Sequence, residues 1–210
     1  GGTCNAGVCT IVDNAGNAGL TAGNNVVSTS TVNGENINIL AANVNGGTYR
    51  ADYANDGLAG DLFINTTGTT GLTNAITVTD AYDVDITAGG AINLVSISTV
   101  AGDIILNAGT TITGGAMTAT KDVEVVAAGT VTLNGAVSGA TVNVESTAAD
   151  LDINNAVTGT AGDVTLAAAD GIAIGAFTVQ SAGLLTVLGN TDADAAGDVT
   201  LCIPTAFMSY

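Results

Sequence analysis

Short stretches in which two apolar residues flank one other residue recur along the chain at steps of about 20 residues. In each stretch the two apolar side chains lie on one side of an extended strand, because side chains alternate between the two faces of a strand. Segments rich in Gly, Ala, Asn, Asp and Thr separate the stretches and predict turns. Three series of such stretches keep a fixed phase, which predicts three short strands in every repeat.

The three series can be followed by residue number. The first comprises Val84-Asp85-Ile86, Ile104-Ile105-Leu106, Val123-Glu124-Val125, Val142-Asn143-Val144, Val164-Thr165-Leu166 and Leu185-Thr186-Val187. The second comprises Ile92-Asn93-Leu94, Ile112-Thr113, Val131-Thr132-Leu133, Leu151-Asp152-Ile153 and Ile172-Ala173-Ile174. The third is a single apolar column at Ile97, Met117, Val137, Val157 and Phe177. Towards the N-terminus the step lengthens, since Ile37-Asn38-Ile39 aligns with Leu62-Phe63-Ile64 over about 25 residues.

Strands of about three to five residues cannot bury a core within a single repeat. Each strand gains a partner when it stacks on the equivalent strand of the next repeat, which forms parallel sheets with a spacing of roughly 4.8 Å. The sequence therefore predicts an all-β protein, a parallel β-solenoid of triangular cross-section with about nine or ten coils. An antiparallel β-sandwich is the alternative, but its strands would not repeat in phase over five coils.

We expect one solenoid domain over residues 1–210. Residues 1–36 are expected to form the N-terminal coils, residues 47–57 a loop that projects from the solenoid, and residues 202–210 an apolar C-terminal tail. The loop holds Tyr49, Arg50 and Tyr53, which makes it a candidate binding loop for a glycan or a protein. Asn65-Thr66-Thr67 matches the acceptor pattern for N-glycosylation at Asn65.

Composition and charge narrow the classes of function. The chain has 19 acidic and 2 basic residues, no His and a net charge of −17. Binding to phosphate requires clustered Lys and Arg, so we expect neither nucleic acid nor an anionic membrane surface as a partner. No apolar run reaches the roughly 18 residues of a membrane helix, so we expect no membrane insertion. Without His, no Ser or Cys nucleophile has its usual base, and we expect no enzyme activity.

Acidic residues precede the strands of the first series at a position that the fold places on one corner. These residues are Asp61, Asp83, Asp103, Asp122, Asp163 and Asp198. Neighbouring carboxylates would lie about 5 Å apart, and Ca²⁺ bound between coils would relieve their repulsion. The alternative is that each Asp accepts hydrogen bonds from backbone N–H groups of its turn, with no cofactor bound.

The three cysteines lie near the two ends of the chain, at Cys4, Cys9 and Cys202. A disulfide requires Cα atoms within about 7 Å, whereas a stack of this length separates its first and last coils by some 45 Å. Two hypotheses remain: Cys202 bridges to Cys4 or Cys9 of a neighbouring molecule, or Cys4 pairs with Cys9 and Cys202 stays a buried thiol. The cysteines and the start at Gly1 without Met favour a secreted, mature form at the cell exterior.

A short motif, Ala-Gly-Asp followed by an apolar residue, any residue and an apolar residue, recurs at 101–106, 161–166 and 196–201. With the period of about 20 residues over residues 60–201, this motif resembles the right-handed parallel β-helix of filamentous-haemagglutinin-type exoproteins and autotransporter passengers. The resemblance implies a right-handed coil and an extracellular location.

A solenoid has two exposed edges, and each is a template for another chain. Neither end of this sequence has an evident polar cap, and the C-terminus carries the apolar residues Ile203, Phe207, Met208 and Tyr210. We therefore expect a structural subunit that assembles head to tail with itself into an extracellular filament. The alternative is a cell-surface adhesin that binds glycan or protein through residues 47–57.

Overall fold

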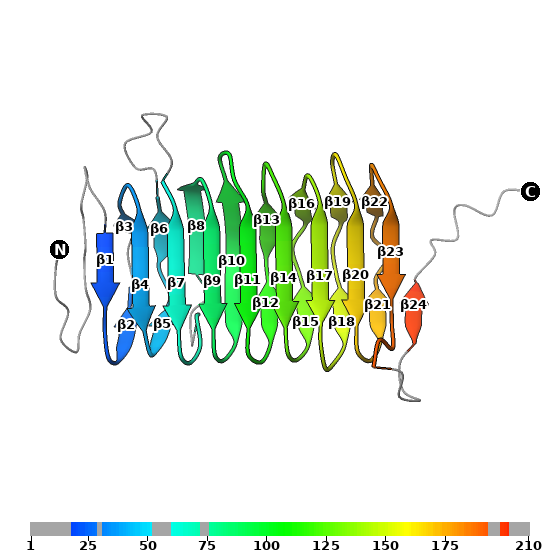
Figure 1. Ribbon diagram of the computed structural model, residues 1–210, viewed down its shortest axis with the longest axis horizontal. Coiled ribbons are helices and arrows are strands. Elements are labelled where there is room, and N and C mark those ends of the chain that lie inside the picture. The colour runs from blue at the N-terminus through cyan, green and yellow to red at the C-terminus, as the bar shows by residue number, and fades with distance from the viewer. Residues whose placement is uncertain (1–17, 29–30, 52–59, 72–75, 193–197, 202–210) are drawn as a thin grey trace, which may run out of the picture.

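The computed structural model describes residues 18–28, 31–51, 60–71, 76–192 and 198–201. Within these ranges the regular structure is β-strand throughout, and every strand pair is parallel. The strands stack along the long axis of the molecule, with β1 (Ala18–Thr21) towards one end and β24 (Val199–Leu201) at the other (Figure 1). This arrangement confirms the predicted all-β parallel solenoid.

One face of the solenoid, here the first face, is a single sheet of nine strands. Its strands, in order along the stack, are β1, β4 (Ile37–Ala41), β7 (Leu62–Thr66), β9 (Val84–Ala88), β11 (Ile104–Ala108), β14 (Val123–Ala127), β17 (Val142–Ser146), β20 (Val164–Ala168) and β23 (Leu185–Leu188). These strands contain the predicted first series.

The other two faces share one strand, β10 (Ile92–Thr99), which continues around the corner between them. The second face contains β2 (Asn25–Val27), β5 (Asn43–Asn45), the start of β10, β12 (Ile112–Gly114), β15 (Val131–Leu133), β18 (Leu151–Ile153), β21 (Ile172–Ile174) and β24. The third face contains β3 (Thr31–Asn33), β6 (Thr48–Arg50), β8 (Ile76–Ala81), the end of β10, β13 (Ala116–Thr118), β16 (Val137–Gly139), β19 (Val157–Gly159) and β22 (Val179–Ser181).

The register of the strands confirms the first two predicted series. Val84, Ile104, Val123, Val142, Val164 and Leu185 lie opposite one another in consecutive strands. The same holds for Ile92, Ile112, Val131, Leu151 and Ile172. Ile37 also pairs with Leu62, as the longer N-terminal step predicts.

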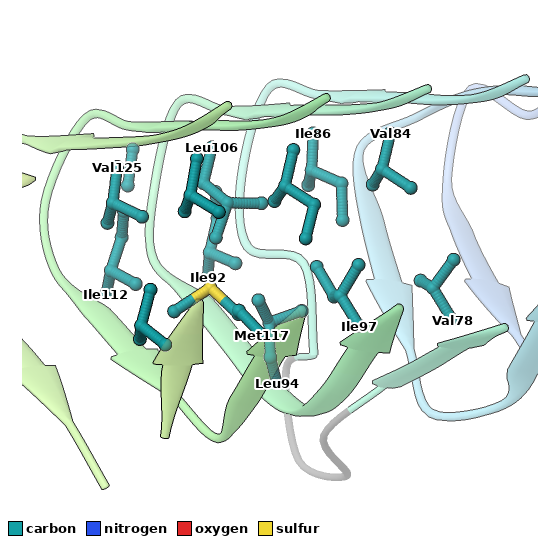
Figure 2. Close-up of a cluster of buried hydrophobic side chains, with 14 of the residues drawn as sticks. Val78, Val84, Ile86, Ile92, Leu94, Ile97, Leu106, Ile112, Met117 and Val125 are labelled. Carbon is teal, nitrogen blue, oxygen red and sulfur yellow. The ribbon is translucent and has the colours of Figure 1, made fainter. Parts of the chain in front are cut away.

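The apolar side chains of the three faces fill the interior between the sheets. Figure 2 shows side chains of the first face pointing towards those of the second and third faces, among them Ile86, Leu106, Ile97, Ile112 and Met117. All five are at most 2% exposed. Burial of these apolar side chains in stacked columns is the main stabilising contribution, because each short strand has little stability alone.

The third predicted column is wrong at its last member. Val157 pairs with Val179 and not with Phe177, which is 48% exposed. Two extra residues occupy this corner, where the Phe177 N–H donates a hydrogen bond to the Gly175 carbonyl at 2.7 Å. The insertion moves Val179 into the column, where it packs against the core.

The described residues make about eight turns, where the sequence predicted nine or ten coils. Two coils use more of the chain than the others. The coil from Ile37 to Leu62 spans about 25 residues and the coil from Ile172 to Val199 about 27. The predicted projecting loop over residues 47–57 is wrong at residues 48–50, because Thr48–Arg50 is strand β6 of the third face.

Candidate functional site

The predicted acidic corner forms a ladder of hydrogen bonds beside the first face. In each rung, the Oδ1 atom of an Asp accepts the backbone N–H of a residue in the following coil, at N···O distances of 2.7–3.2 Å. We call the five acceptors the carboxylate ladder: Asp61, Asp83, Asp103, Asp122 and Asp163. Asn36 precedes them and does the same as an amide, since its Oδ1 accepts the Asp61 N–H at 3.0 Å.

These bonds show what the carboxylates do in the fold. Each one satisfies a backbone donor at a turn that would otherwise lack a partner in the sheet. Neighbouring ladder carboxylates repel each other by about 1 kcal/mol in water, and salt screens this repulsion at exposed positions such as Asp61 and Asp83. The structure thus assigns the ladder to backbone hydrogen bonding between coils.

Substitutions of a ladder residue can show whether its acceptor oxygen or its negative charge stabilises the corner. We expect Asp103→Ala to lower the free energy of unfolding by about 1–2 kcal/mol, because the Asp122 N–H loses its acceptor. Asp103→Asn keeps an acceptor oxygen, as Asn36 does, and is expected to be at least as stable as the wild type. Denaturant midpoints of the three proteins measure the difference. Equal losses in both variants would mean that the charge, and not the acceptor, stabilises this corner.

Asp198 does not belong to the carboxylate ladder, which corrects the prediction that placed it there. Strand β24 pairs with β21 on the second face, with Val199 opposite Ile172. The preceding residue, Asp198, therefore lies at the corner before the second face. The motif at 196–201 does not identify the corner, because the same turn pattern occurs at two corners. At this second corner Asp150 Oδ1 accepts the Gly171 N–H at 2.9 Å.

Bound Ca²⁺ was the other hypothesis for the acidic corner. Among the described residues, no group of three or more Asp, Glu, His or Cys side chains is arranged to hold a metal ion. One oxygen of each ladder carboxylate already accepts an N–H. We therefore expect removal of divalent cations with a chelator to leave the melting temperature unchanged. A melting temperature that falls with chelator and recovers with added Ca²⁺ would establish the cation instead.

Two of the three residues predicted for the binding loop, Tyr49 and Arg50, lie in strand β6 instead. Tyr49 is fully buried in β6, its hydroxyl donates to the Gly46 carbonyl at 3.0 Å, and burial raises its pKa above the usual range. Arg50 forms an ion pair with Asp80, with 2.5 Å between Nε and Oδ2. Tyr53 lies outside the described residues. Placing Tyr49 in an exposed loop was wrong, because its ring fills the interior column between Val32 and Val78.

Asn65, the predicted glycosylation site, lies in β7 on the first face. It is half-buried and stands between Leu40 and Thr87 of the neighbouring coils. The next residue, Thr66, faces inward and its hydroxyl donates to the Gly68 carbonyl at 3.1 Å. Because side chains alternate along a strand, Asn65 is on the outward side, and its glycosylation stays a prediction.

The feature that the sequence did not locate is an apolar end at the last described coil. Five large apolar residues are 43–65% exposed there: Phe177, Leu184, Leu185, Leu188 and Val199. Leu185 and Val199 occupy inward columns whose preceding members, Val164 and Ile172, are at most 1% exposed. The other end differs, since Ala18 and Leu20 of β1 are 2% and 3% exposed. Five of the nine exposed large apolar residues among the described ones therefore lie at this end, and the other four, Leu40, Val95, Val100 and Ile105, lie elsewhere along the stack.

A hollow of about 460 Å³ lies beside this apolar end on the second face. Four carboxylates line it, from Asp150, Asp152, Asp170 and Asp198. Their charge makes the hollow unsuitable for anionic ligands. The described residues also include no helix of the length and apolarity that membrane crossing requires.

Comparisons with known proteins add no relative to this description. No family model and no curated protein matches the sequence, and no solved structure matches the fold. The carboxylate ladder, the buried Tyr49 and the apolar end are therefore the features that bear on its function.

Proposed function

We propose that this chain is a structural subunit that assembles with copies of itself, end to end, into an extracellular filament. The observation that carries the proposal is the exposed apolar end formed by Phe177, Leu184, Leu185, Leu188 and Val199. Exposed apolar surface of this kind is typical of a protein interface. Leu185 and Val199 continue the inward columns at the end of the stack, which favours a contact that lengthens the solenoid.

The backbone at this end supports the same conclusion. Strands β22, β23 and β24 each have a partner on one side only among the described residues. The free edge of such a strand carries unpaired N–H and C=O groups that bind a further strand. An added coil would satisfy these groups and bury the apolar columns in the same step.

The negative charge of the chain would keep neighbouring filaments from associating side by side. A net charge of −17 includes the carboxylate ladder along one corner, so lateral contacts between filaments meet like-charge repulsion. Secretion to the cell exterior and the resemblance to filamentous-haemagglutinin-type exoproteins belong to the same proposal. A right-handed coil is the hand that parallel strand connections almost always take.

Several predicted interface residues lie outside the described residues, namely Cys4, Cys9, Cys202, Ile203, Phe207, Met208 and Tyr210. For them the expectation is unchanged: Cys202 bridges to Cys4 or Cys9 of the next subunit. Denaturing gels of assembled protein, with free thiols blocked beforehand, should show a ladder of multimers that reductant collapses. A single band near 20 kDa without reductant would instead support a local Cys4–Cys9 disulfide.

Assembly of the purified chain tests the proposed function directly. Light scattering over a range of concentrations should show growth above a critical concentration, and negative-stain images should show unbranched filaments. Added salt is expected to lower the critical concentration because it screens the acidic subunits. A stable monomer at every concentration and salt would contradict the proposal.

The alternative function is an adhesin that binds through residues 47–57. Fewer residues of this segment are available for binding than the sequence predicted. Tyr49 is in the core and Arg50 is already paired with Asp80, so neither is available without rearrangement. Replacing residues 52–59 by a Gly-Ser linker leaves β6 intact and removes the rest of the segment. Loss of glycan or protein binding with normal assembly would support the adhesin.

A further inference from the structure

Hydrogen bonds in which a side chain accepts a backbone N–H from another coil share one direction in this solenoid, whereas the backbone hydrogen bonds between coils run both ways. In ten hydrogen bonds a side chain accepts a backbone N–H from another coil, and in each of them the acceptor lies in the coil nearer the N-terminus. The acceptors are Asn36, Asn43, Asp61, Thr69, Asp83, Thr99, Asp103, Asp122, Asp150 and Asp163. In these ten bonds each coil supplies a side-chain acceptor to the coil that follows it.

Asp198 is the last carboxylate in this directional arrangement. It occupies the corner before the second face, where Asp150 already accepts the Gly171 N–H from the next coil. The Asp198 carboxylate is exposed and has no hydrogen-bond partner among the described residues. By the same rule, its donor belongs to a coil stacked beyond β24.

We propose that this donor is a backbone N–H at the N-terminal end of a second copy, so that subunits join head to tail with Asp198 as an acceptor at the contact. The inference rests on the proposed function and adds the polarity of the contact and one of its residues. Contact between two C-terminal ends would place two apolar ends together, but it would leave the Asp198 carboxylates facing each other without donors.

The distribution of charge favours the same polarity. The described residues 18–51 carry only two charged side chains, Glu35 and Arg50. The last coils carry Asp163, Asp170, Asp192 and Asp198 in the described ranges. A head-to-tail contact sets this acidic end against an almost neutral end. A contact between two acidic ends adds repulsion of about 1 kcal/mol for each close pair of carboxylates in water.

Substitutions at Asp198 test the acceptor. We expect Asp198→Ala to raise the critical concentration for filament growth about tenfold, the effect of losing one charge-assisted hydrogen bond. Asp198→Asn keeps an acceptor oxygen and should assemble at or below the wild-type concentration. Glu124→Ala removes one charge from the outward side of β14 and serves as the control. Loss of charge alone favours assembly, so the two alanine variants should move in opposite directions.

The outcomes separate this inference from the proposed function. Filaments of the wild type together with unimpaired assembly of Asp198→Ala would overturn the role of Asp198 and leave the filament standing. Failure of the wild type to assemble would overturn both. Circular dichroism melts of the monomers below the critical concentration show whether a variant has lost its fold, and Asp198→Asn provides a second comparison in that case.

A single cysteine tests the polarity independently. Thr186→Cys, with Cys4, Cys9 and Cys202 each replaced by Ser, places one thiol on the last strand of the first face. Head-to-tail contacts separate these thiols by the length of a subunit, so oxidation of filaments should give no covalent dimer. A reducible dimer that forms in high yield would mean that C-terminal ends meet, and would overturn the proposed polarity.

Discussion

Leu106→Lys should abolish the folded state, whereas Ile105→Lys, one residue away, should leave it intact. Leu106 is fully buried between Ile86 and Val125 in the inward column of the first face. A lysine there would bury an ammonium group with no partner, which costs at least about 4 kcal/mol. Circular dichroism spectra and thermal melts of the two variants measure the difference.

Ile105 is the matched control because it is 40% exposed and lies between Asp85 and Glu124 on the outward side. A lysine at this position meets two carboxylates on neighbouring strands, which is worth roughly 0.2–1 kcal/mol for each pair. Ile105→Lys should therefore melt at or slightly above the wild-type temperature. Two variants of equal stability would mean that the inward and outward sides of β11 are assigned wrongly.

Gly135→Ala is expected to destabilise the solenoid by about 3 kcal/mol. A Cβ atom at this position would overlap the backbone of Gly115 and Ala116 in the preceding coil. Backbone atoms cannot move aside without separating the coils, so the substitution acts as overpacking. Denaturant unfolding monitored by circular dichroism measures the loss.

Gly19→Ala is the corresponding control, because a Cβ atom there meets nothing within 4 Å. Replacing glycine by alanine within a strand typically stabilises it by about 0.5–1 kcal/mol, and Gly19 lies in β1. The two alanine variants should therefore shift the unfolding midpoint in opposite directions. A neutral Gly135→Ala variant would mean that the coils are not in close contact at this corner.

The stack of strands could be predicted from the sequence because every coil repeats the same apolar pattern. Val84 to Leu185 and Ile92 to Ile172 form columns in the structure as their spacing indicated. Parallel in-register pairing is the only arrangement that keeps such columns buried in successive coils. The period therefore carries most of the information about the fold.

The predictions failed where a coil departs from the common length. Phe177 was placed in the third column because it lies 20 residues after Val157, but a two-residue insertion gives that place to Val179. Tyr49 was assigned to a loop because residues around it contain Gly, Asp and Asn, although its own strand pairs with β3 and β8. Local composition marks turns, and it does not show which of two neighbouring segments enters the sheet.

The apolar end could not be located from the pattern of residues. Leu185 and Val199 have the same sequence context as the buried Val164 and Ile172, and only the absence of a described coil above them leaves them exposed. Exposure of this kind depends on position in the stack. The direction of the corner hydrogen bonds is likewise a property of the stacked coils, because each bond joins residues about 20 positions apart.

X-ray diffraction from aligned assemblies of the purified chain tests end-to-end stacking most directly. Strands in this solenoid run across the long axis and stack along it with a spacing of roughly 4.8 Å (Figure 1). Filaments built by end-to-end contact keep that stacking direction parallel to their own axis, so we predict a strong meridional reflection near 4.8 Å. The same reflection on the equator would show that subunits associate side by side, and would contradict assembly through the apolar end.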